Sequence, residues 1–400
     1  MGIRKIGILP RLFAAIAIGA IVGAFAPAWT IRALNTFSGV FGQYIKFIVP
    51  FIILGLVTPA IADTGRNAGK ILLVTMGVAY ASTLFAGYLA FVASSELLPR
   101  IVSGGLESGV AASSYPAYFK LPIPPVMDVV TALVVAFMFG LAIVSIKGEA
   151  LYRFFSEMRE AVMLTVVKTM VPVLPFFILA VIADLAASGK LKIVGSSCAR
   201  IMFAAFAVTV FLLLVQYAVA GIVAGRNPIR ALLTQLPAYL TGFGCCSSAA
   251  TIPVNLKQTK LNGVSDDTAD LVIPLCANVH LAGSMSNMVF YTAGVLVLLG
   301  EPLSIAAYTK FILMISVIAV ASPGIPGGVV LASASIAESA LGLSPERYSL
   351  VIAMYLALDG MGTACNLTGD GAIAIVVDRF RKFAERPENK KGKSDDGKGQ

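Results

Sequence analysis

The sequence predicts an all-α, multi-pass membrane protein, and composition carries most of that prediction. Of the 400 residues, 58% are hydrophobic and 13% are charged, whereas soluble domains have roughly 45–50% apolar and roughly 25% charged residues. Mean hydropathy is +0.88. Apolar stretches such as Ile71–Ala93 are continuous, whereas the strands of a membrane β-barrel alternate over ~10 residues. A soluble domain and a β-barrel are therefore both excluded.

Each predicted span is an apolar segment long enough to cross a bilayer, which takes about 20 residues. The first segment could instead be a secretory signal, because basic residues precede its apolar run. Its length and the interfacial Trp29 favour a retained helix. Eight transmembrane helices are expected, at about 11–29, 37–62, 69–94, 126–146, 160–187, 194–224, 268–299 and 348–377.

Two further segments, 228–256 and 302–341, are apolar but interrupted. Their centres, 242–253 and 322–328, are rich in glycine, serine and proline. Irregular backbone at membrane depth is tolerated only where protein buries it or a water-filled cavity reaches it. We therefore expect two re-entrant helical hairpins whose tips meet inside the bundle.

The distribution of basic residues predicts the orientation. With a cytoplasmic N-terminus, 20 of the 30 lysines and arginines lie inside, eight of them in the tail 379–400. This asymmetry favours cytoplasmic N- and C-termini in the plasma (inner) membrane. The first hairpin then enters from inside and the second from outside, which is typical of an inverted-repeat secondary transporter. The tail is too short to form a nucleic-acid-binding domain, so nucleic acid is not an expected partner.

The last span carries a polar stripe. Ionisable side chains at membrane depth are costly and by default indicate a functional site. The alternative is a helix that lines a water-filled crevice without binding a ligand. Two carboxylates with an amide between them offer oxygens for a cation and a counter-charge for an amine. The members recur at i, i+4, i+7 and i+11 and so share one helix face: Asp359, Thr363, Asn366 and Asp370.

The seventh span holds His280, the only histidine. A lone histidine is commonly a core residue bonded to a backbone carbonyl. Facing two aspartates, it could instead carry a proton or replace a cation ligand. Asn278 would add an amide, and Gly283 would allow a break in the helix.

The hairpin tips offer the complementary groups. Ser247, Ser248 and Thr251 bring hydroxyls and N–H groups at a helix start, a suitable cradle for a carboxylate. Glycines of the second tip, Gly324 among them, allow close backbone approach. Either tip could also be a simple kink.

At these residues the chain resembles the dicarboxylate/amino acid:cation symporter family, which has the glutamate-transporter fold. The similarity runs through nearly the whole chain and is densest over 242–378. Segments 247–253 and 324–327 resemble the two hairpin tips of the family, and 359–370 resembles its eighth-helix motif. Ser82-Thr83 falls where the third helix of the family places a hydroxyl pair.

The resemblance implies an architecture and a mechanism. It implies a homotrimer in which residues 1–66 and 126–190 form a scaffold, with spans 1, 2, 4 and 5. Residues 67–125 and 191–378, with spans 3, 6, 7 and 8 and both hairpins, would be a transport domain that moves as an elevator.

The resemblance also implies roles for individual residues. Asp359 would hold the substrate amino group, Asn366 would meet the substrate carboxylate, and Asp370 would ligate sodium. No cofactor is implied besides Na⁺ or H⁺ as coupling ion, with His280 the candidate for a proton. The implied substrate-binding set is Ser247, Ser248, Gly324, Asp359, Gly362, Thr363 and Asn366. The implied sodium-binding set is Ser82, Thr83, Cys276, His280, Asn366 and Asp370.

The departures from the family are informative too. Gly362 stands where acidic-substrate members have an arginine, so a second substrate carboxylate would be left unpaired in a dry site. His280 and Ala282 replace an asparagine and a cation-ligating aspartate, so at least one family sodium site is expected to be lost. Coupling would then use fewer sodium ions, or a proton at His280.

The sequence therefore predicts cation-coupled symport of a small neutral amino acid, similar to serine, threonine or alanine. The alternatives are a symporter of C4-dicarboxylates or acidic amino acids, and an uncoupled facilitator or anion channel. An enzyme is not expected, because no nucleophile–base pair, metal cluster or phosphate-binding loop is recognisable.

Overall fold

A computed structural model describes residues 8–66, 70–102, 115–189, 191–321 and 327–384. Every element in these ranges is helical, which confirms the predicted all-α class. Large apolar side chains remain exposed over much of the exterior, among them Phe25, Phe203 and Ile222. Apolar surface on this scale is typical of contact with lipid. The chain is a multi-pass membrane protein.

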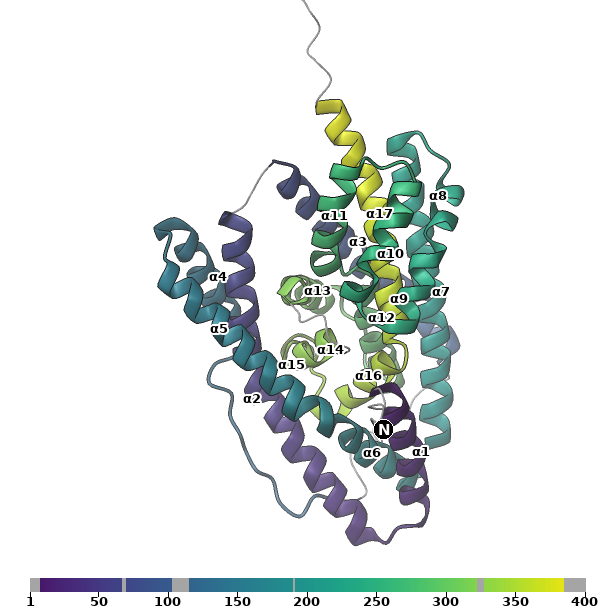
Figure 1. Ribbon diagram of the computed structural model, residues 1–400. Helices are drawn as coiled ribbons and strands as arrows, with labels where there is room; N and C mark the ends of the chain where they lie inside the picture. Colours follow the sequence, from purple (N-terminus) through teal and green to yellow (C-terminus); the bar gives the residue numbers. More distant parts are fainter. Residues whose placement is uncertain (1–7, 67–69, 103–114, 190, 322–326, 385–400) are drawn as a thin grey trace, which may run out of the picture.

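Most helices follow one another with short connections, and the longest separates α3 from α4 (Figure 1). The first half comprises α1 (Ile8–Phe25), α2 (Ala28–Arg66), α3 (Lys70–Ile101), α4 (Val129–Ile146), α5 (Glu149–Thr165), a π-helical turn (Val166–Met170), α6 (Val171–Ala187) and α7 (Leu191–Ala224). The second half comprises α8 (Pro228–Thr234), α9 (Leu236–Cys245), α10 (Ser248–Leu261), α11 (Asp266–Val279), α12 (Ala282–Leu298), α13 (Ile305–Ala321), α14 (Gly328–Ala332), α15 (Ala334–Leu341), α16 (Pro345–Ala357) and α17 (Asp359–Ala384).

Among the described residues, four helices are long and apolar enough to cross a membrane, or six if each bent pair is one span. The bent pairs are α5 with α6 and α16 with α17. Two of the shorter apolar helices, Ala14–Phe25 and Thr131–Ile146, lie in the predicted first and fourth spans. The total of eight spans stays a prediction.

The last two spans are not continuous. A break in the seventh span was expected at Gly283 and lies just before it, whereas none was expected in the eighth. The seventh is interrupted at His280 and Leu281, and the eighth at Leu358, where the helix axis bends by 61°. Hydrogen bonds from elsewhere satisfy backbone groups that the first break frees. Leu281 N–H donates to Thr83 Oγ1 at 3.3 Å, and Gly283 N–H to Asn366 Oδ1 at 2.8 Å.

Small residues set how closely the helices approach. A Cβ on Gly19 or Gly23 would lie 2.7 Å from Leu179 O or 2.2 Å from Ala183 O, so α1 packs with its backbone directly against α6. Membrane helices commonly associate through small residues spaced by four, because there is no hydrophobic driving force between helices in lipid. α1 and α6 use that arrangement.

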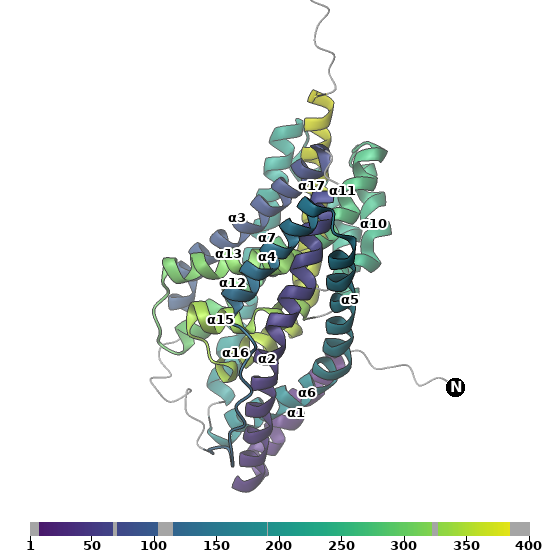
Figure 2. The same cartoon turned by 90° about the vertical axis from the view of Figure 1, so that its left-hand side faces the viewer.

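The helices group into two sets by their contacts. In the first, α2 packs on α4, α5 and α6, and α1 on α6. In the second, α17 packs on α7, α9, α10, α11 and α12. Figure 1 shows α2, α4 and α5 along one side, with α13 and α15 between them and α17, and Figure 2 looks onto that side, with α2, α4 and α5 in front. An ion pair at 2.6 Å joins Lys46 of α2 to Glu338 of α15 and so ties the second hairpin to the first set.

Candidate functional site

The tip of the first hairpin and Gly327 of the second hairpin lie at the start of α17. The first hairpin is α9 and α10, joined by Cys246 in the left-handed backbone conformation (φ 50°). A Cβ on Gly360 would lie only 2.2 Å from Phe243 O and 3.2 Å from Cys246 Sγ, so this tip rests on α17. In the second hairpin, Gly327 (φ 75°) precedes α14. Gly327 N–H donates to Asp359 Oδ2 at 3.0 Å.

Asp359 is the first residue of α17 and its carboxylate is buried, with 7% of the residue exposed. Its one hydrogen bond among the described residues comes from the Gly327 backbone. A buried carboxylate with a single neutral donor is poorly compensated, because burial of an unpaired charge is costly. The site is therefore suited to bind a cationic group such as an ammonium.

The other members of the predicted stripe are also buried on α17. Thr363 is 8% exposed and Asn366 is 3% exposed. The Asn366 side chain is fully engaged with the start of α12: Oδ1 accepts from Gly283 N–H and Ser284 N–H, and Nδ2 donates to Ser284 Oγ at 3.0 Å. In this structure the Asn366 amide stabilises the helix break.

Further along α17, Asp370 forms a second buried centre with His280. Both side chains are fully buried, with His280 Nδ1 2.9 Å from Asp370 Oδ1. On its other edge, His280 Nε2 lies 3.1 Å from Ser82 Oγ and 3.4 Å from Gln216 Nε2. His280 therefore bonds to side chains of α3 and α17 rather than to a backbone carbonyl.

Ser82 and Gln216 extend this cluster to α3 and α7. Gln216 Nε2 donates to Ser82 Oγ at 3.0 Å. One edge of the ring therefore faces Ser82 and Gln216, and the opposite edge faces Asp370.

One oxygen of this carboxylate has no partner. Asp370 Oδ2 is buried and makes no hydrogen bond with any described residue. A buried anionic oxygen left unpaired is costly. A hard cation such as Na⁺ prefers an oxygen of this kind, so Asp370 offers a cation-binding position beside His280.

The remaining predicted residues lie around these two centres. Ser247 caps α10, with its Oγ 3.4 Å from Ala250 N, and Ser248 follows it at the first tip. Thr83 Oγ1 donates to Ala79 O at 3.0 Å and receives Leu281 N–H. The carbonyl of the buried Cys276 accepts from His280 N–H at 2.8 Å. Gly324 and the tail from 385 lie outside the described residues.

Two polar residues at the site were not predicted. Gln216 joins the His280 cluster from α7, and Asn287 of α12 lies against Gly362. A Cβ on Gly362 would be 3.1 Å from Asn287 Nδ2 and 3.4 Å from Ser284 Oγ. Gln216 is an isolated amide inside a long apolar run, and that pattern could have marked it as a site residue.

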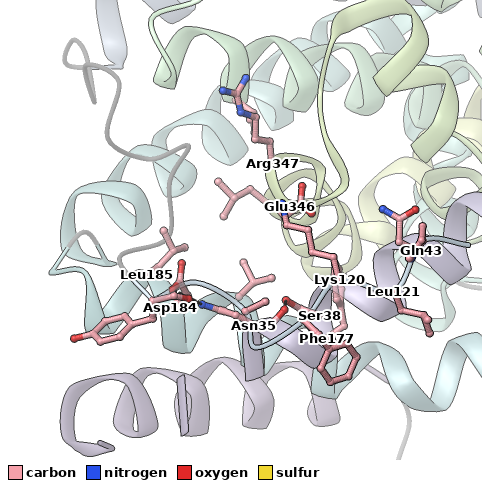
Figure 3. Close-up of a pocket in the computed structure, with 18 of the residues that line it drawn as sticks. Asn35, Ser38, Gln43, Lys120, Leu121, Phe177, Asp184, Leu185, Glu346 and Arg347 are labelled. Atoms are coloured by element: carbon pink, nitrogen blue, oxygen red, sulfur yellow. Dashed lines mark hydrogen bonds between the residues drawn. The ribbon is translucent and has the colours of Figure 1, made fainter. Parts of the chain in front are cut away.

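One cavity adjoins the His280 cluster, and a larger one has no residue of either centre in its lining. The first, of about 250 Å³, lies between α3, α7 and α17, with Ser82, Gln216 and Gly369 in its otherwise apolar lining. The other, about 470 Å³, lies where α2, α6 and the segment 115–122 meet α12 and α16. Figure 3 shows Asp184, Lys120, Glu346 and Arg347 around it. None of the predicted substrate-binding residues lines this second cavity.

Comparison with known proteins decides the family. The sequence pattern of the sodium:dicarboxylate symporter family matches residues 8–380. The chain belongs to this family. It is 26% identical over 396 residues to the serine/threonine transporter SstT of Streptococcus thermophilus, covering 94% of this chain and 97% of that protein. It is 27% identical over 278 residues to the neutral amino acid transporter B(0) of human and of mouse.

The match to the B(0) transporters is partial. It covers 66% of this chain and 49% of the mouse protein or 50% of the human one. The family match, by contrast, includes α1 through most of α17 and therefore both hairpins and both buried centres of this symporter. Proteins of this family are transporters, which supports the prediction that the chain is not an enzyme.

At Gly283 of α12, the backbones of α12 and α17 pack directly against each other. A Cβ there would lie 2.5 Å from Cys365 Cβ and 2.6 Å from Gly362 O. Gly283→Ala is expected to lower the melting temperature by several degrees, because overpacking costs about 1–3 kcal/mol. Gly77→Ala on α3, with nothing within 4 Å, is the control. It should be neutral or slightly stabilising, since alanine favours helix. If Gly283→Ala and Gly77→Ala had the same melting temperature, the close packing at Gly283 would be contradicted.

Proposed function

We propose that this protein is a cation-coupled symporter of a small neutral amino acid. The observation that carries the proposal is Asp359, a buried carboxylate whose described hydrogen bond is a single backbone N–H from the second hairpin tip. An α-ammonium group would supply the missing positive charge. The hydroxyls and N–H groups of Ser247 and Ser248, at the first tip, supply the complementary donors for the α-carboxylate.

The residues around Gly362 favour a substrate whose side chain is neutral. Among the described ion pairs, none places a lysine or arginine at Asp359, Thr363 or Asn366. A substrate with a second carboxylate would bury that charge unpaired, at a cost of several kcal/mol. The names of the relatives, a serine/threonine transporter and neutral amino acid transporters, support the same substrate class.

The coupling cation is assigned to Asp370, whose Oδ2 is unpartnered. Sodium at Oδ2, or a proton on the Asp370–His280 pair, would compensate its charge. A cavity between α3, α7 and α17 is lined by Ser82 and Gln216 of this cluster. An uncoupled facilitator is the second candidate, because Ala282 removes one cation-ligating carboxylate of the family motif.

The proposed mechanism is an elevator motion in a homotrimer of the plasma membrane, with cytoplasmic termini. The scaffold would comprise 1–66 and 126–190, and the transport domain 67–125 and 191–378. The ion pair between Lys46 and Glu338 crosses this proposed boundary and would have to break during the motion.

The function is tested by uptake into liposomes that contain the purified protein. Serine, threonine, alanine, glutamate, aspartate and succinate are each offered under a sodium gradient, a proton gradient or neither. Accumulation of the neutral amino acids under one gradient is expected. Proton-driven uptake that His280→Asn abolishes would assign coupling to His280, and sodium-driven uptake would assign it to Asp370 alone. Equilibration without accumulation would establish the facilitator, and preference for glutamate or succinate would reject the neutral substrate.

A further inference from the structure

A third group of buried polar side chains lies between the first hairpin and α17. Each of its five members is at most 1% exposed. Polar groups buried to this degree are expected to be hydrogen-bonded. The members come from α7, the junction of α8 and α9, α10 and α17, and we call them the hairpin seam: Tyr217, Gln235, Asn255, Thr259 and Thr368.

The direct hydrogen bonds of the hairpin seam leave two amide oxygens without a donor. Asn255 Nδ2 donates to Leu367 O at 2.8 Å. Gln235 Nε2 donates to Thr259 Oγ1 at 2.9 Å. Asn255 Oδ1 and Gln235 Oε1 are buried and accept no hydrogen bond from a described residue. A buried acceptor without a donor is costly, so both oxygens call for a donor from outside the described chain.

Thr368 adds a hydroxyl group to the same seam. Its Oγ1 is also buried without a hydrogen-bond partner among the described residues. Its carbonyl, by contrast, accepts from the Tyr217 hydroxyl at 2.8 Å. Because a hydroxyl can both donate and accept, the hairpin seam holds two unpartnered acceptors and one unpartnered group that is able to donate.

Contacts with α17 bring these three groups together. Asn255 contacts α17 at Leu367. Gln235 contacts it at Gly371, where a Cβ would lie 2.2 Å from Gln235 Nε2. The two contact points are one turn apart, about 6 Å along the helix axis, and Thr368 lies between them. A water molecule that bonds to two oxygens at about 2.8 Å each spans about 5.6 Å, so one molecule fits this spacing.

We propose that an ordered water molecule binds in the hairpin seam, held by Gln235, Asn255 and Thr368. It donates its two hydrogens to the amide oxygens and accepts the hydrogen of the Thr368 hydroxyl. About three hydrogen bonds are typical of a buried water. A monovalent cation fits less well, because the hairpin seam contains no carboxylate and a buried charge without a counter-charge is costly. Since α10 begins at the first tip, this water joins the tip-bearing helix to α17.

The test is Thr368→Val, which removes the hydroxyl and keeps the shape of the side chain. The substitution takes one hydrogen bond from the water, so the melting temperature of the purified protein should fall by about 2 °C. An unchanged or higher melting temperature would overturn the proposal, because the loss of an unpartnered buried hydroxyl costs nothing. Thr75→Val on α3 is the matched control. Thr75 is also fully buried, but its Oγ1 donates to Ile71 O of its own helix at 2.8 Å, so the melting temperature should stay close to native.

A change of salt distinguishes a water from a cation. Replacing sodium by potassium or choline should leave the difference in melting temperature between the native protein and Thr368→Val unchanged. Sodium at Asp370 would affect both proteins alike. A difference that disappears in choline would overturn the water in favour of a bound cation.

A double variant tests whether Asn255 and Thr368 share one molecule. In an Asn255→Ala background, Thr368→Val should lower the melting temperature by less than it does in the native chain, because the two side chains are coupled through the water. Equal effects in both backgrounds would overturn the shared site. If a variant does not fold, a density map of the native protein that resolves ordered waters decides. A peak within hydrogen-bonding distance of all three side chains is expected, and a map without that peak rejects the proposal.

Discussion

Asp359→Asn is expected to reduce amino acid uptake at least about 100-fold. The substitution removes the negative charge that compensates the substrate ammonium group, and breaking a buried ion pair costs about 3–5 kcal/mol. The protein should still fold, because the asparagine oxygen can accept the hydrogen bond that Gly327 N–H now gives to Asp359 Oδ2 at 3.0 Å. Substrate binding, measured as the rise in melting temperature on adding serine, should disappear together with uptake.

Asp378→Asn provides the control for this experiment. Asp378 also lies on α17 and is 2% exposed, but it bonds to Ser265 and Lys382 and lies two turns beyond Asp370. Its substitution should leave the serine-induced stabilisation intact. Native uptake by Asp359→Asn would remove the basis for an amine-bearing substrate, and a C4-dicarboxylate would become the better hypothesis.

The α17 stripe could be predicted from sequence because its information is local. Asp359, Thr363, Asn366 and Asp370 share a face by helical spacing, and all four are buried. The glycine-rich interruptions near 242–253 likewise indicated a hairpin, and α9 and α10 form one there. These inferences needed the helical period and the cost of polar groups in lipid, and no knowledge of which helices are neighbours.

The facing residues could not be predicted in the same way. Nearly every residue of α12 is buried, so its sequence shows no polar and apolar faces that would single out Asn287. Gln216 reaches His280 from a helix 64 residues away in sequence. The break at His280 also depends on distant partners, Thr83 and Asn366, and occurs before Gly283 rather than at it. Tertiary contacts decide these features.

Asp370→Asn is expected to abolish gradient-driven accumulation while exchange of internal for external amino acid continues. The Asp370 carboxylate is the one negative charge bonded to His280, and its Oδ2 is the buried oxygen available to a cation. An amide in its place carries no charge, so neither sodium nor a proton would be favoured there. The substrate groups bind at Asp359, more than two turns away on α17, and should be retained.

The measurement pairs two assays on the same liposomes. Accumulation against a concentration gradient should fall to the level of empty liposomes, whereas exchange of labelled serine at equal concentrations on both sides should stay within about threefold of native. Asp359→Asn serves as the contrast, because it should lose both activities. If Asp370→Asn still accumulates serine under the native driving ion, the coupling cation binds elsewhere. The His280–Asp370 pair would then be a neutralised structural contact that holds α11 against α17.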